Sequence, residues 1–112
     1  MSCIVIMPNF RNAMIYKIQC KDKRVKSFYI GSTCDYEQRK ISHMNACHNA
    51  SHMHHEYPLY QFMRHRGNWE NWEMVPLEWC PCKNANQLKL KEQEYIDRLK
   101  PKLNTINSIG LD

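Results

Sequence analysis

The sequence of 112 residues lacks any long apolar run. The apolar stretch at 3–7 stops at Pro8 and is far shorter than the roughly 20 apolar residues of a membrane-spanning helix. The first residues also lack the charged region and apolar core of a secretory signal. Repeats and low-complexity tracts are absent as well. We therefore expect no membrane segment, no secretion, and a single domain over residues 1–112.

An excess of acidic residues is also missing. The chain has 16 Lys and Arg against 11 Asp and Glu, a formal net charge of +5. Such a protein is attracted to polyanions in a salt-dependent way, which favours a nucleic acid as partner. The excess is moderate, and many basic proteins bind no nucleic acid.

Disulfides are not expected, although the chain has the cysteines Cys3, Cys20, Cys34, Cys47, Cys80 and Cys82. Without a secretory signal, they favour reduced thiols in an intracellular compartment, the cytoplasm or the nucleus. Four histidines (His48, His52, His54 and His55) also raise a zinc hypothesis. However, a C-x-C pair and scattered histidines lack the paired spacing of structural zinc sites.

The first half of the chain predicts a hairpin followed by a helix. Strand-forming residues alternate over 14–18 and 27–31, on either side of a polar turn. We expect Gly31-Ser-Thr to break the second strand. Asp35 then predicts the N-cap of a helix over 36–47, with Gln38 as a capping-box-like partner.

The middle of the chain is less regular. The polar segment 45–56 shows no clear period, which predicts a loop. Pro58 suits the first turn of a short helix over 59–66, and Gly67 would stop that helix.

The last part predicts a strand and a helix. The strand spans 72–79, and Pro76 argues for a sheet edge or a bulge. The helix begins at Asn84 or Asn86 and ends near Lys100, because a residue before proline avoids helical backbone. The element order β-β-α-α-β-α predicts an α/β (α+β) fold, with a small three-stranded antiparallel sheet flanked by helices.

The last helix carries a carboxylate in its apolar stripe. The stripe consists of Leu88, Tyr95, Ile96 and Leu99. Glu92 occupies the stripe position between Leu88 and Tyr95, where an apolar residue would complete the helical spacing. Because a buried carboxylate needs a partner or a metal ion, Glu92 is either a rim residue paired with a lysine such as Lys89, or part of a site.

Two other pairs of residues are candidates for the same site. Tyr16 and Tyr29 project from one face of the hairpin if its register allows, and Arg39 and His43 share a helix face. Taken alone, the tyrosines are typical of packing residues, and the Arg and His pair is typical of a solvated face.

Together these residues resemble a known family. The matching residues are Met14-Ile15-Tyr16, Tyr29-Ile30-Gly31, Arg39, His43, and the run Glu92-x-x-x-Ile96-x-x-Leu99-x-Pro101-x-x-Asn104. This pattern resembles the GIY-YIG nucleases and covers about residues 13–104. Met14 stands where the first triplet has glycine in the family. The blocks 57–62 and 67–73 are similar to stand-alone members of the family in large DNA viruses.

The resemblance implies a metal-dependent endonuclease that cuts duplex or branched DNA. Glu92 would be the ligand of Mg²⁺ (or Mn²⁺), and Arg39 would stabilise charge on the phosphate. Tyr16 or Tyr29 would contact the attacking water, and which of them is the base stays open. Since one active site cuts one strand, a double-strand break would need a homodimer or two visits.

The resemblance also implies two supporting residues. His43 would accept or relay a proton, and Asn104 would position Glu92 or the chain that follows the helix. Two alternatives remain: a catalytically inactive nucleic-acid binding module with this fold, which Met14 favours, and a zinc-stabilised interaction domain.

Overall fold

The sheet of this computed structural model, which describes residues 8–105, has three antiparallel strands in the order β2-β1-β3. Strands β1 (Met14–Cys20) and β2 (Phe28–Thr33) form the hairpin, and β3 (Trp72–Trp79) pairs with the other side of β1. The expected α+β fold with a three-stranded antiparallel sheet is confirmed, and β1 is its central strand.

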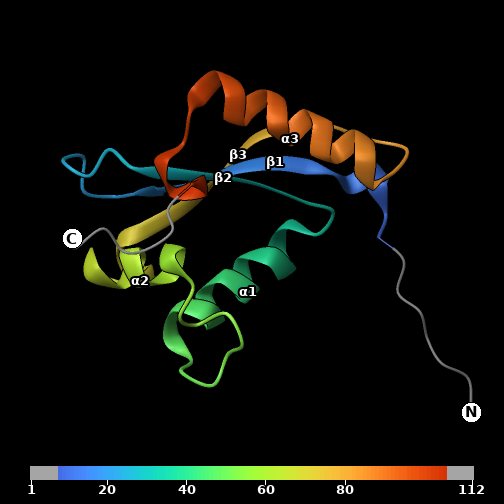
Figure 1. Cartoon of the computed structure of the whole chain (residues 1–112). Helices are drawn as coiled ribbons and strands as arrows, with labels where there is room; N and C mark the ends of the chain where they lie inside the picture. The colour runs from blue at the N-terminus through green and yellow to red at the C-terminus, as the bar shows by residue number, and fades with distance from the viewer. Residues whose placement is uncertain (1–7, 106–112) are drawn as a thin grey trace, which may run out of the picture.

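Helices cover both faces of this sheet. Helix α3 (Ala85–Leu99) lies over one face, whereas α1 (Tyr36–His48) and α2 (Pro58–His65) lie over the other (Figure 1). Three short 3-10 helices, η1 (Phe10–Asn12), η2 (Trp69–Asn71) and η3 (Lys102–Asn104), join the elements. No helix within residues 8–105 is long and apolar enough to cross a membrane.

The central strand explains why two apolar clusters form. Its side chains alternate between the faces, so Ile15 packs in the cluster under α3, and Tyr16 and Ile18 pack in the cluster under α1 and α2. All three side chains are fully buried. Strand β1 therefore has buried side chains on both faces, and the helices on each side pack against it.

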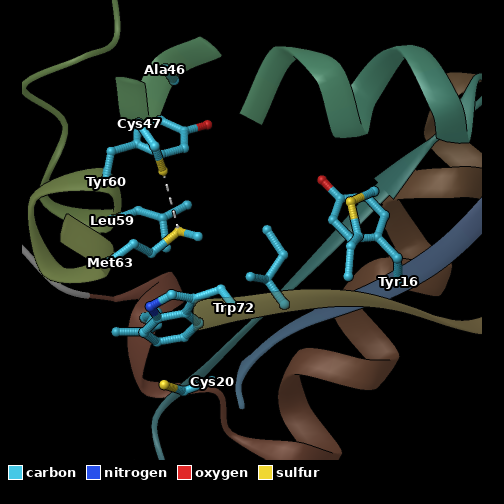
Figure 2. Packing of buried hydrophobic residues seen from close by; sticks show 11 residues of the cluster. Tyr16, Cys20, Ala46, Cys47, Leu59, Tyr60, Met63 and Trp72 are labelled. Atoms are coloured by element: carbon cyan, nitrogen blue, oxygen red, sulfur yellow. Dashed lines mark hydrogen bonds between the residues drawn. The ribbon is translucent and has the colours of Figure 1, made fainter. Parts of the chain in front are cut away.

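The larger cluster is where α1 meets α2. Figure 2 shows Cys47 of α1 beside Leu59 and Met63 of α2, with Trp72 below them. The Cys47 Sγ lies 3.9 Å from the Met63 Sδ. All five cysteines of residues 8–105 are free thiols, and Cys3 lies outside the described residues.

Two expectations about the hairpin end are wrong. Strand β2 does not break at Gly31 but continues to Thr33, because Ser32 and Thr33 pair with Ile15 and Met14 of β1. The Asp35 carboxylate accepts from the Gln38 N–H (3.1 Å) and caps α1 as expected. The reciprocal bond from the Gln38 side chain does not form, since the Asp35 N–H donates to the Thr33 hydroxyl instead.

The segment 45–56, expected to be a loop, is partly helical. Helix α1 ends at His48, just past its predicted end at Cys47, so the first residues of this segment belong to the helix, where Ala46 and Cys47 are buried. Only the residues after His48 form turns.

The later elements follow the sequence closely. Pro76 lies in an edge strand, and the pairing of β3 shifts by one residue there, so that Ile15 faces Glu78 while Tyr16 faces Pro76. The edge and the bulge are both confirmed. Asn84 caps α3, and Lys100 ends it in the left-handed conformation, with φ 50°.

The N-cap of α1 provides a stability test. Replacing Asp35 by Ala removes the acceptor of the Gln38 N–H, and we expect the free energy of unfolding to fall by about 1 kcal/mol. Asp35→Asn keeps an acceptor and should stay close to the wild type. Urea unfolding followed by circular dichroism measures both, and equal losses in the two variants would contradict the cap.

Candidate active site

The register of the hairpin places two tyrosines on one face. Tyr16 pairs with Gly31, and Ile18 pairs with Tyr29, so Tyr16 and Tyr29 are diagonal neighbours. Their ring centroids are 6.4 Å apart. Both rings pack in the cluster on the α1 and α2 side of the sheet.

Gly31 makes room for the ring of Tyr16. A Cβ atom at Gly31 would overlap the Tyr16 hydroxyl and the adjoining ring carbons. The backbone of Gly31 does not have a positive φ, so the requirement for glycine is steric and not conformational. The Tyr16 ring therefore lies across the hairpin.

A buried hydrogen-bond chain begins at Tyr16. Its hydroxyl lies 2.7 Å from His43 Nε2, and His43 Nδ1 lies 2.8 Å from the hydroxyl of Tyr60 on α2. Tyr16 and His43 are fully buried, and Tyr60 is 4% exposed. A neutral imidazole has one N–H, so His43 donates to one tyrosine and accepts from the other.

Arg39 lies one turn before His43 on α1. Its Nε–H donates to the Tyr16 hydroxyl at 3.3 Å, and its side chain is half-buried. The four-residue spacing puts both side chains on the helix face toward the sheet. Tyr16 therefore links the arginine to the histidine.

Burial controls the protonation of this group. Burial and, to a smaller extent, the positive charge of Arg39 together lower the pKa of His43 to about 3. Burial also raises the pKa of Tyr60 to about 12 and raises that of Tyr16 more strongly, although Arg39 opposes the shift of both tyrosines. At neutral pH, His43 is therefore uncharged and both tyrosines keep their protons.

A cavity of about 240 Å³ opens next to this group. Tyr29 and Arg39 line it together with residues of the segment between α1 and α2, of α2 itself and of η3, namely His54, Tyr57, Pro58, Leu59, Tyr60 and Leu103. Tyr16 is not among its lining residues. The cavity thus reaches Tyr29 and Arg39 but not Tyr16.

Glu92 lies on the α3 side of the sheet. Its Oε1 accepts from the Ser32 hydroxyl at 2.7 Å, and its side chain is half-buried. The alternative in which Glu92 pairs with Lys89 is not observed, since no ion pair within residues 8–105 involves Glu92. The neighbouring Lys91 pairs with Glu78 and Glu94 instead. Among the described residues, the Glu92 carboxylate therefore has no cationic partner.

The structure does not join Glu92 directly to the Tyr16, Arg39 and His43 group, but its charge reaches the second tyrosine. Burial raises the pKa of Tyr29, Arg39 lowers it, and Glu92 raises it. The two sides of the edge strand β2 are therefore coupled electrostatically.

The donor set suits Mg²⁺ better than zinc. Mg²⁺ binds through one or two carboxylates and keeps several waters, and Glu92 offers one carboxylate that no cation neutralises. Among the described residues, no three His, Cys, Asp or Glu side chains form a group suited to a metal. The zinc hypothesis based on the histidine-rich segment thus gains no support from the geometry.

Asn104 holds β2 and forms no hydrogen bond with Glu92. Its Oδ1 accepts from the Ile30 N–H, and its Nδ2 donates to the Ile30 carbonyl, both at 2.8 Å. Because Ile30 lies between Tyr29 and Gly31, the amide fixes the strand at the site. The alternative role, positioning the chain after α3, agrees with this contact.

The family comparison agrees with this geometry. The family model described as the GIY-YIG catalytic domain matches residues 12–107. The chain belongs to the GIY-YIG family. The expected match over about 13–104 lies within this range. No curated protein and no solved structure matches significantly, so the likeness to viral members stays a prediction.

Met14, the departure from the GIY-YIG pattern, is easily accommodated. It lies in extended backbone, paired with Thr33 and Trp79, and is partly exposed. A side chain here meets no requirement for positive φ. Met14 therefore gives no structural reason for loss of the site.

Sequence reasoning missed Ser32 and Tyr60. Strand alternation from Ile30 would have placed Ser32 on the α3 face, once β2 was known to continue. Tyr60 had no local signal, because its contact with His43 joins two helices separated by a turn-rich segment.

Gly31→Ala tests the close approach of Tyr16. The added Cβ must displace the ring, so we expect the free energy of unfolding to fall by about 1–3 kcal/mol. In a Tyr16→Leu background, which removes the opposing atoms, the same change should cost little. A double-mutant cycle by urea unfolding measures the coupling, and purely additive losses would contradict the contact.

His43 predicts a dependence of stability on pH. Unfolding returns its pKa from about 3 to 6.5, so the unfolded chain takes up a proton that the folded chain excludes between these values. Stability is therefore full above pH 6.5 and decreases as the pH falls toward 3. Between pH 7 and pH 5, we expect the wild type to lose about 1–2 kcal/mol more than His43→Gln.

Urea unfolding at several pH values measures this difference. His65→Gln, which alters an exposed histidine, is the matched control. Equal pH slopes for the wild type and His43→Gln would rule out a neutral buried imidazole.

Proposed function

We propose that this GIY-YIG protein is an endonuclease that hydrolyses DNA phosphodiester bonds with Mg²⁺ or Mn²⁺. The observation that carries the proposal is the contact of Arg39 with the Tyr16 and His43 pair beside a cavity that Tyr29 lines. Phosphodiester hydrolysis needs a positioned water, a proton acceptor and positive charge near the phosphate.

Arg39 provides the positive charge. Its guanidinium stays protonated at any working pH and can donate two hydrogen bonds to a phosphate. The Nε contact with Tyr16 fixes the side chain in advance, leaving the terminal nitrogens for the phosphate. Such preorganised donors have the largest effect when charge develops in the transition state.

Tyr29 is the better candidate for contact with the attacking water. It lines the cavity, whereas Tyr16 is fully buried and already hydrogen-bonded to His43. In this arrangement Tyr16 and His43 position Arg39, and His43 remains neutral. Burial raises the pKa of Tyr29 and Arg39 lowers it, so Tyr29 would accept the proton of the attacking water when Arg39 and a metal ion at Glu92 together stabilise the phenolate.

Glu92 would hold the metal ion. Ser32 donates to one carboxylate oxygen and sets the direction of the other lone pairs. A divalent cation bound there would polarise the phosphate, stabilise the leaving oxygen and offset the effect of the carboxylate on the pKa of Tyr29.

A plasmid assay tests the proposal. Purified full-length protein should nick supercoiled DNA with Mg²⁺ or Mn²⁺, and chelator should stop cleavage while circular dichroism shows an intact fold.

Two variants test the site residues in the same assay. We expect Glu92→Gln to abolish cleavage with little loss of stability, because glutamine can still accept from Ser32. Arg39→Ala should lower the rate by about 100- to 1000-fold.

The controls use neighbours of the same chemistry. Glu94→Gln changes an exposed carboxylate on α3, and Lys40→Ala removes the exposed cation next to Arg39. Both should cleave like the wild type. If the wild type and all variants show equal trace nicking, the enzyme hypothesis fails and a non-catalytic binding module remains.

A further inference from the structure

The segment between α1 and α2 exposes aromatic rings beside the cavity. The Tyr57 ring stacks on His54, with centroids 4.3 Å apart and planes at 23°, and His54 lies against His52 at 5.4 Å. Tyr57 is also near-parallel to the buried Tyr60, at 6.5 Å and 23°. Yet 51% of Tyr57 is exposed.

This segment holds its shape through its own hydrogen bonds. The Tyr57 N–H donates to the His54 carbonyl at 2.9 Å, and the His55 N–H donates to the His52 carbonyl at 3.0 Å. His55 Nδ1 also lies 2.8 Å from the Ala46 carbonyl, which ties the segment to the end of α1. These bonds fix the backbone that carries Tyr57, and the stack on His54 restrains its ring, so little ordering is left for a ligand to induce.

The rings and the proposed phosphate site share one cavity. Tyr57 and His54 line the same hollow as Arg39 and Tyr29. A phosphate that meets Arg39 thus places its adjoining nucleotide near the exposed ring. Exposed aromatic rings bind nucleobases of any sequence by stacking, and a cation close by holds the backbone.

We propose that the exposed ring of Tyr57, supported on one face by His54, is a stacking site for an unpaired base next to the scissile phosphate, so that the substrate is DNA with an unpaired nucleotide at the cut. This inference rests on the proposed function for the position of the phosphate. In an intact duplex, neighbouring bases cover both faces of each base. Only an unpaired nucleotide can offer its face to Tyr57.

The test compares two DNA duplexes of the same sequence, one fully paired and one with a single-nucleotide bulge of 2-aminopurine. Full-length protein in EDTA is used, so that binding is measured without cleavage. We expect tighter binding of the bulged duplex and quenching of the 2-aminopurine fluorescence. Tyr57→Ala should weaken binding of the bulged duplex by about 5- to 100-fold and leave the paired duplex nearly unchanged.

Two variants separate stacking from other roles of Tyr57. Tyr57→Phe keeps the ring and should retain the preference and the quenching. Met53→Ala, at a residue of the same segment that is 83% exposed and does not line the cavity, should behave like the wild type. Equal wild-type binding of both duplexes, an absence of quenching, or an equal loss in Met53→Ala would overturn the inference.

These outcomes are distinct from failure of the nuclease proposal. Bulge-specific binding that depends on Tyr57, without any cleavage when Mg²⁺ is added, supports the stacking site and overturns only the enzyme. Cleavage without a preference for the bulge supports the enzyme and overturns only the stacking site.

Discussion

The hydrogen bond between the Tyr16 hydroxyl and His43 Nε2 organises this molecule. Tyr16 comes from the central strand and His43 from α1, and Tyr60 of α2 completes the chain. Neither partner of the first bond reaches water. Loss of the Tyr16 hydroxyl would leave the buried Nε2 of His43 without a partner, which costs about 1–3 kcal/mol. The bond therefore fixes how the helical layer sits on the sheet, and with it the position of Arg39.

Burying this chain of polar groups costs desolvation free energy, which apolar side chains of similar size would avoid. Its presence is understandable if orientation matters more than stability. A neutral histidine held between two phenols keeps Tyr16 from rotating, and Tyr16 in turn restrains the guanidinium. The cavity then borders on a cation whose direction is set before any ligand arrives.

Local patterns predicted most of the fold, since Asp35, Pro76 and Asn84 act through their own backbone environment. The clearest error arose where a tertiary contact prevails: strand pairing carries β2 past Gly31 to Thr33. At the site, spacing and resemblance proposed each residue singly. They did not indicate that Glu92 accepts from Ser32, or that His43 reaches Tyr60, because these contacts join elements distant in sequence.

The amide of Asn104 has a consequence beyond the site. Strand β2 is an edge strand, and a free edge is a template on which another chain can add a strand, the usual route to sheet extension and aggregation. At Ile30, both outward backbone groups are already bound to the side chain of the same molecule. A second copy would have to displace Asn104 before it could extend the sheet across this point. Self-association along β2 therefore has to use side-chain surfaces, and a continuous intermolecular sheet is disfavoured there.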